Sequence, residues 1–207
     1  MEALVMAGGK GSRMCPNGVE KPFIKVGEKH VIEQVINALR KARNIDRILV
    51  TVSPNTKYTE QFLKDIGVET LHTSGEDYVG DLHAAYQVMN GKYVFSTPSD
   101  MPLLRPYTVD DFIDAFNKDP HDSFLAVVDE ETVIKSGIKP SFAMELDGKR
   151  WVLSGFTIMN REAILRNEQP PDHYYKTDWI ELAVNVNTMH ELQMARMYYD
   201  TEFSSDQ

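Results

Sequence analysis

The chain has 207 residues, of which 42% are hydrophobic and 26% are charged, and its formal net charge is −9 at pH 7. These proportions are typical of a globular protein that buries a full hydrophobic core. The acidic balance argues against general nucleic-acid binding, which requires a basic surface. The single cysteine, Cys15, excludes an internal disulfide or a cysteine-based zinc site. It favours a reducing, cytoplasmic location, and we expect neither a signal peptide nor a membrane span.

The first two thirds of the chain alternate short apolar segments with longer amphipathic ones. Runs typical of strands occupy residues 3–6, 47–53, 68–71, 93–97 and 124–128. Apolar residues at helical spacing occupy residues 31–43, 59–66, 79–89 and 109–117. This order predicts a Rossmann-like α/β fold, in which helices cover both faces of a mostly parallel sheet. Ligands of such sheets bind beyond the carboxyl ends of the strands, here after Met6, Val52, Leu71 and Thr97.

The last third of the chain has a different pattern. We expect strand, strand, short helix, strand and closing helix at residues 141–146, 152–159, 161–167, 183–186 and 189–199. No repeat, low-complexity tract or linker interrupts the sequence, so we expect one domain over residues 1–207. In this domain the residues after 130 would add a small lobe to the sheet.

A glycine-rich segment directly follows the first predicted strand: Ala7, Gly8, Gly9, Lys10, Gly11, Ser12, Arg13 and Met14. Glycines let the backbone turn tightly and bring its N–H groups close to phosphate oxygens. Lys10, Arg13, Lys21 and Lys25 place four cations within residues 10–25, where Glu20 is the only acid. In so acidic a chain this basic segment indicates a triphosphate site, and a solvated glycine turn with surface lysines is the structural alternative. The segment matches neither a P-loop nor a dinucleotide-binding motif.

An aspartate follows the strand predicted at residues 93–97. Asp100 should reach the same edge of the sheet as the glycine-rich segment. A carboxylate among phosphates needs a cation between them, and Mg²⁺ takes oxygen ligands from both groups. The sequence therefore favours Asp100 as a magnesium ligand, and the alternative is a helix N-cap or a turn residue.

The residues Gly8-Gly9-x-Gly11-x-Arg13-Met14, followed by Glu20-Lys21-Pro22, resemble the signature of nucleotidyltransferases with a glycosyltransferase-A-like fold. The resemblance implies three catalytic residues. Arg13 would hold the departing pyrophosphate, Lys21 would stabilise charge on the α-phosphate, and Asp100 would bind Mg²⁺. It also implies that Asn187 touches the metal or an acceptor phosphate. Alternatively, Asn187 only caps the helix that follows it.

Nearly the whole chain resembles the archaeal adenosylcobinamide-phosphate guanylyltransferases, through residues 1–14, 18–22, 53–56, 73–75, 81–82, 99–100, 155 and 185–188. This family transfers GMP from GTP to adenosylcobinamide phosphate and releases pyrophosphate. The implied nucleotide-binding residues are Ala7, Gly8, Gly9, Lys10, Gly11, Ser12, Arg13, Lys21, Ser53, Asn55, Thr73, Ser74, Gly75 and Asp81. The implied acceptor-binding residues are Gly155, Asn185 and Asn187. Guanine presents N–H donors, which Asp81 or the backbone near Gly75 would accept.

Other interpretations stay open. Molybdenum-cofactor guanylyltransferases share the first loop but usually carry Gly-Pro-Leu-x-Gly where this chain has residues 75–80, and another small nucleotidyltransferase is a further alternative. A regulatory protein that binds GTP without turning it over would need neither Lys21 nor Asp100. In the favoured interpretation, residues 1–130 bind the nucleotide and residues 131–207 supply acceptor-side elements and a closing helix. The six histidines show no metal-ligand spacing, so we expect them on the surface or in packing.

Overall fold

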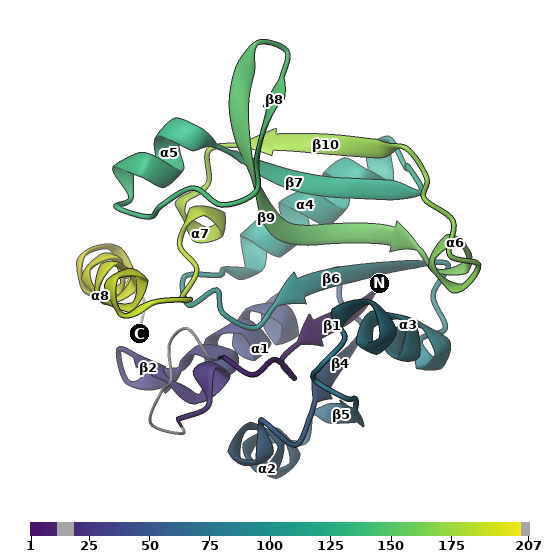
Figure 1. Ribbon diagram of the computed structural model, residues 1–207, viewed down its shortest axis with the longest axis horizontal. Helices are drawn as coiled ribbons and strands as arrows, with labels where there is room; N and C mark the ends of the chain where they lie inside the picture. Colours follow the sequence, from purple (N-terminus) through teal and green to yellow (C-terminus); the bar gives the residue numbers. More distant parts are fainter. Residues whose placement is uncertain (12–18, 204–207) are drawn as a thin grey trace.

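The computed structural model describes residues 1–11 and 19–203, and within them eight strands form one sheet (Figure 1). Across the sheet the strands are β10 (Asp172–Thr177), β7 (Ser123–Asp129), β9 (Lys149–Asn160), β6 (Tyr93–Pro98), β1 (Glu2–Met6), β4 (Arg47–Val52) and β5 (Glu69–His72). The strand β8 (Ala143–Leu146) pairs with β9 and forms a hairpin with it. The pairs β10–β7, β6–β1, β1–β4 and β4–β5 are parallel, and β9 runs antiparallel to its neighbours. The prediction of a mostly parallel α/β sheet is confirmed.

The helices lie on both faces of this sheet, as predicted. They are α1 (Val31–Lys41), α2 (Lys57–Asp65), α3 (Tyr78–Val88), α4 (Pro106–Lys118), α5 (Glu130–Lys135), α6 (Arg161–Leu165), α7 (Ile180–Ala183) and α8 (Met189–Tyr198). Alternate residues of β1 define the two faces, because successive side chains of a strand point to opposite sides. Ala3 and Val5 pack in one buried cluster with α1 and α4, whereas Leu4 packs in a second cluster with α3 and α6.

The structure differs from the sequence-based prediction in the last third of the chain. The strand predicted at residues 183–186 is wrong, because Ala183 ends α7 and the backbone N–H of Val186 donates to the Asp100 carbonyl (2.9 Å) instead of joining the sheet. The sequence also did not predict α5 or the strand β10. Two of the six β10 residues are charged, and the strand lies at the sheet edge, so apolar patterning does not reveal it. No helix in the described part of the chain could cross a membrane.

A cluster of three rings anchors the segment between the glycine-rich loop and α1. The 3₁₀ helix η1 (Lys21–Phe23) is followed by the short hairpin β2 (Lys25–Val26) and β3 (Lys29–His30). Phe23 stacks on His30 with ring centroids 3.8 Å apart, and Phe62 of α2 meets both rings edge-on. Burial, assisted by the positive charge of Lys25, lowers the pKa of His30 below its ordinary value of 6.5. His30 is therefore neutral in the folded protein near neutral pH.

This burial predicts a pH dependence of stability. The unfolded chain accepts a proton on His30 more readily than the folded protein does, so the free energy of unfolding should fall as pH drops below 6.5. His30→Phe keeps the ring contact and should lose less stability between about pH 7.5 and about pH 6. Urea unfolding at both pH values measures the difference. The exposed His190→Gln should behave like the unsubstituted protein, and an equal loss in His30→Phe would refute the assignment.

Candidate active site

Two adjoining cavities open at the carboxyl ends of β1, β4 and β6. The first has a volume of about 290 Å³, and its lining includes the side chains of Lys10, Lys21, Ser99, Asp100 and Asn187. The second, about 300 Å³, is lined in part by Gly8, Thr51, Gly75, Tyr78, Asp81 and Gly155. They share Met6, Gly9 and Pro98, so they are two compartments of one cleft. The cleft lies where ligands bind in parallel α/β sheets.

Three distant parts of the chain meet in the first compartment. Lys21, at the start of η1, donates through Nζ to Asp100 Oδ2 (2.5 Å) and to Asn187 Oδ1 (2.7 Å). Asp100 follows β6 and is only 7% exposed. The bond from the Val186 N–H to the Asp100 carbonyl fixes the Asn187 segment beside it. The structure therefore brings together three residues that sequence analysis assigned to one site.

The structure excludes the helix-cap alternative that the sequence left open for two residues. The helix α8 is capped by Thr188, whose side chain accepts the Glu191 N–H, so Asn187 is not the cap. Arg105 occupies the N-cap position of α4, so Asp100 is not a helix cap either. Both side chains are directed instead at the Lys21 ammonium.

The donor set of this compartment suits a hard cation. Asp100 Oδ1 is buried and has no hydrogen-bond partner among the described residues. A buried, unpartnered carboxylate oxygen is costly, and a cation would remove that cost. Asn187 Oδ1 approaches the same ammonium and contributes a neutral oxygen. Carboxylate and amide oxygens are ligands that Mg²⁺ and Ca²⁺ accept.

The predicted basic segment divides into residues that line the cleft and residues that do not. Lys10 lines the first compartment and pairs with Glu76 of the second (2.9 Å). Both side chains are more than half exposed, so the pair contributes at most about 1 kcal/mol. Lys25 lies on β2 and is not among the described residues that line either compartment. Ser12 and Arg13 lie outside the described residues.

The loops after β4 and β5 support the wall of the second compartment. Ser53 is fully buried and donates through Oγ to the Gly8 carbonyl (2.6 Å), which fixes the glycine-rich loop against β4. The Asp81 carboxylate accepts from Ser74 N (2.9 Å), Ser74 Oγ (2.8 Å) and Gly75 N (2.8 Å). Ser53 and Ser74 are thus structural supports. Asp81 supports the loop and also lines the second compartment.

Two glycines permit close approaches at this compartment. Gly75 has φ +67°, and a Cβ there would lie 2.4 Å from the Gly8 carbonyl oxygen. Gly155 of β9 has φ +88°, and a Cβ there would lie 2.5 Å from Pro98 Cγ. Only glycine adopts such positive φ values without strain and leaves this space. The two positions bring the β5 loop and β9 against the ends of β1 and β6.

Some residues predicted from the sequence lie elsewhere. Asn55 is exposed, and neither Asn55 nor Thr73 is among the described residues lining the cleft. Asn185 lines a separate cavity of about 20 Å³ beside Ser154. The structure therefore separates Asn185 from Asn187 and places Gly155 in the Asp81 compartment.

Sequence analysis missed two residues. Tyr78 lines the second compartment at the start of α3, and an aromatic residue directly after the Asp77 N-cap was the available signal. Glu20 accepts hydrogen bonds from Tyr58 N, Thr59 N and Thr59 Oγ1, each of 2.7 Å. Glu20 thereby satisfies the open amino end of α2 and stabilises its dipole. Since Glu20 directly precedes η1, this bond also holds Lys21 at the cleft.

Comparison with solved structures defines the fold. The chain superimposes on a CMP:2-keto-3-deoxy-manno-octonic acid synthetase in complex with CTP with a TM-score of 0.75. The match covers 98% of this chain and 100% of the other, at 13% sequence identity, and it establishes the fold. The fold is the glycosyltransferase-A-like fold of nucleotidyltransferases, with the charged cleft at the carboxyl edge of the sheet.

Sequence relatives specify the family. The profile of the MobA-like NTP transferase domain matches residues 3–190, and the chain belongs to this family. It is 30% identical to the adenosylcobinamide-phosphate guanylyltransferase of Methanocaldococcus jannaschii, over 95% of this chain and 96% of that one. It is 33% identical to a probable molybdenum cofactor guanylyltransferase of Peptoclostridium acidaminophilum, over 49% of this chain and 42% of that one.

The Glu20 contacts lead to a prediction. Glu20→Ala should lower the free energy of unfolding by about 1–2 kcal/mol, as loss of a helix cap does. It should also reduce turnover roughly 10–100-fold, because Lys21 loses its anchor and small displacements of a catalytic group are costly. Urea unfolding and pyrophosphate release measure the two effects. The exposed Glu28→Ala is the matched control and should change neither, whereas full activity in Glu20→Ala would exclude a positioning role.

Proposed function

We propose that the protein transfers GMP from GTP to adenosylcobinamide phosphate and releases adenosylcobinamide-GDP and pyrophosphate. The observation that carries this proposal is the 30% identity to the M. jannaschii enzyme over nearly the full length of both chains. The meeting of Lys21, Asp100 and Asn187 in one cavity supports the chemistry. The relation to the molybdenum cofactor enzyme covers about half of this chain and is therefore weaker support for that reaction.

The proposed division of the cleft follows from its lining. The first compartment holds the charged groups and the glycine-rich loop, so it suits the phosphates. The lining of the second includes four glycines, Met6, Pro98 and Tyr78, so it suits the flat guanine base. Backbone carbonyls and the lining side of Asp81 would accept the N–H groups of guanine. The ribose and the α-phosphate would lie near Gly9, where the two compartments meet.

The proposed reaction is an in-line attack by an acceptor phosphate oxygen on the α-phosphorus of GTP. Such transfers depend on positioning and charge neutralisation more than on covalent help from the protein. The acceptor phosphate is already ionised at neutral pH, so no general base is needed. Lys21 would offset repulsion between the two anionic reactants. By resemblance to the family, Arg13 would hold pyrophosphate with its two-pronged guanidinium.

Mg²⁺ is the cation we propose for this site. Asp100 and Asn187 would hold it, and it would supply Lewis-acid stabilisation of the phosphate charge. Lys21 is the residue that already compensates the Asp100 charge in the protein alone. Asn187 is the residue we propose to face the acceptor, whereas Gly155 lines the second compartment and would lie beside the nucleotide. Asn185 lies in a separate cavity, so we do not propose a direct contact between Asn185 and the acceptor.

The choice of acceptor is the most direct test. The protein should release pyrophosphate from GTP and Mg²⁺ when adenosylcobinamide phosphate is added, and the product should contain one GMP unit by mass spectrometry. Molybdopterin should give no product under the same conditions. Product with molybdopterin alone would indicate the molybdenum-cofactor reaction. GTP binding without pyrophosphate release, with either acceptor, would indicate the regulatory protein.

Two substitutions test the site. Lys21→Ala should reduce turnover roughly 10²–10³-fold, as loss of one charge-stabilising group does. Asp100→Ala should abolish metal-dependent turnover while the circular dichroism spectrum stays unchanged. Lys41→Ala and Asp65→Ala, which change exposed residues on α1 and α2, are matched controls and should retain full activity. Activity near that of the unsubstituted protein in Asp100→Ala would remove the metal assignment.

A further inference from the structure

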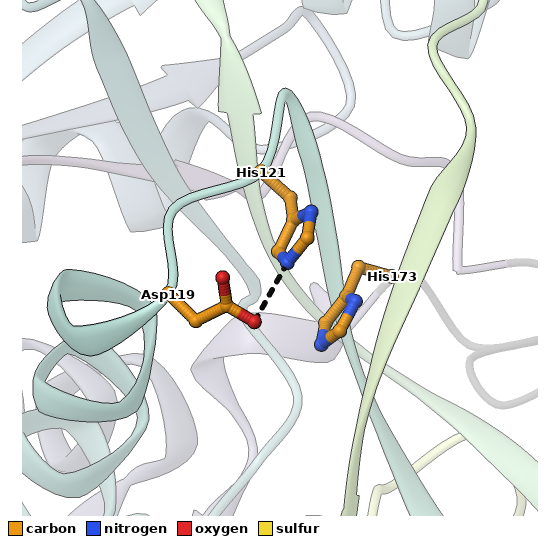
Figure 2. A group of neighbouring side chains, drawn as sticks. All are labelled: Asp119, His121 and His173. Atoms are coloured by element: carbon orange, nitrogen blue, oxygen red, sulfur yellow. Dashed lines mark ion pairs between the residues drawn. The ribbon is translucent and has the colours of Figure 1, made fainter.

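A second group of potential metal ligands lies far from the cleft in sequence and in the sheet. Figure 2 shows Asp119, His121 and His173 facing one another, with one ligand atom of each within 4.8 Å of the others. Asp119 is the C-cap of α4, His121 lies in the loop before β7, and His173 is the second residue of β10. The parallel pairing of β7 with β10 brings His173 beside Phe124 and so close to this loop.

The group lies at the amino ends of the strands, whereas the candidate active site lies at their carboxyl ends. Asp172 pairs with Ser123 where β10 and β7 begin, so the histidines lie at the amino ends of these strands. The Tyr93 hydroxyl, at the amino end of β6, donates to Asp122 Oδ1 (3.2 Å) in the same loop. Asp100 and the cleft follow the carboxyl end of β6. An ion held by the histidines would therefore not take part in the transfer reaction.

The types of ligand specify the class of ion. Two imidazole nitrogens and one carboxylate oxygen suit zinc and other late divalent transition metals, whereas Mg²⁺ prefers an all-oxygen set. The Asp119 Oδ2 and His121 Nε2 atoms are 3.0 Å apart, close to the separation of adjacent ligands on a metal. His121 Nε2 is buried, and among the described residues it contacts the Asp119 carboxylate. A cation between these two atoms would replace that contact.

One of the two rings must turn for both histidines to bind the same ion. His121 and His173 stack with centroids 3.8 Å apart and an angle of 7°, so an ion in the plane of one ring lies outside the plane of the other. The site permits this movement, because the Asp119 side chain is 71% exposed and the His121 side chain 35% exposed. His173 is half-buried on β10, which is an edge strand of the sheet. Rotation of either ring would replace stacking with coordination.

We propose that Asp119, His121 and His173 bind one divalent transition-metal ion of the zinc class. Three protein ligands leave at least one position for water. The ion cross-links the loop between α4 and β7 to the edge strand β10. Because the site exists only when these elements are folded together, ion binding stabilises the native state.

The test uses the untagged, metal-free protein with Zn²⁺, Co²⁺ and Mg²⁺ as separate probes. Calorimetry should show one Zn²⁺ bound per chain, and Mg²⁺ should give no heat that depends on the histidines. At a Zn²⁺ concentration of about 100 times Kd, the melting temperature should rise by roughly 5–10 °C. Co²⁺ should develop a visible absorption band typical of nitrogen coordination. Absence of Zn²⁺ binding to this protein would overturn the proposal.

Substitutions locate the ion. His121→Gln, His173→Gln and Asp119→Ala should each weaken Zn²⁺ binding at least tenfold, and His83→Gln is the matched histidine control that should bind normally. Asp119 is exposed, so its substitution tests the site even where a histidine variant folds poorly. Unchanged binding in Asp119→Ala together with unchanged binding in either histidine variant would place the ion elsewhere and refute the assignment. Transfer of GMP in the presence of Mg²⁺ should be the same in Asp119→Ala as in the unsubstituted protein.

Discussion

A carboxylate buried at the edge of a sheet is stable only beside a cation, and the pairing of Asp100 with Lys21 meets this requirement. The pair joins the segment after the glycine-rich loop to the end of β6, and Asn187 joins the start of α8 to the same ammonium. The Lys21 ammonium therefore links the three chain segments that line the first compartment. The same arrangement of oxygens around a positive group explains why the site suits both a metal ion and anionic phosphates.

The acidity of the protein does not conflict with this role, because many carboxylates are occupied by the backbone. Glu20 accepts the N–H groups at the start of α2, and Asp81 accepts those of the Gly75 loop. Glu2 accepts from Asn90 and Gly91, at the opposite edge of the sheet from the cleft. These acids shape loops, and N–H groups of the backbone stabilise their charge. The net charge of −9 therefore says little about the field inside the cleft.

Two different groups of polar side chains lie at the two ends of the strands. Oxygen ligands, lysines and a glycine-rich loop lie at the carboxyl ends of β1 and β6. The amino ends of β7 and β10 collect two imidazoles and a carboxylate. Each edge thus offers a different donor set, one suited to hard cations with phosphates and the other to zinc-like ions. The match to the MobA-like family spans residues 3–190 and so includes both groups of residues.

The resemblance of residues 8–14 and 20–22 to a known family supplied the role suggested for Lys21. The sequence itself predicted the alternation of strands and helices, the glycine-rich loop, and Asp100 at the carboxyl ends of the strands. These features are local, because they depend on periodicity, on glycine and on the residue types placed directly after a strand. Only the tertiary structure decided that Asn187 faces Lys21 whereas Asn185 does not, that Glu20 caps a helix nearly forty residues later, and that His121 meets His173. Such pairings arise from strand order and register, which bring distant residues together and leave no trace in the spacing of either residue.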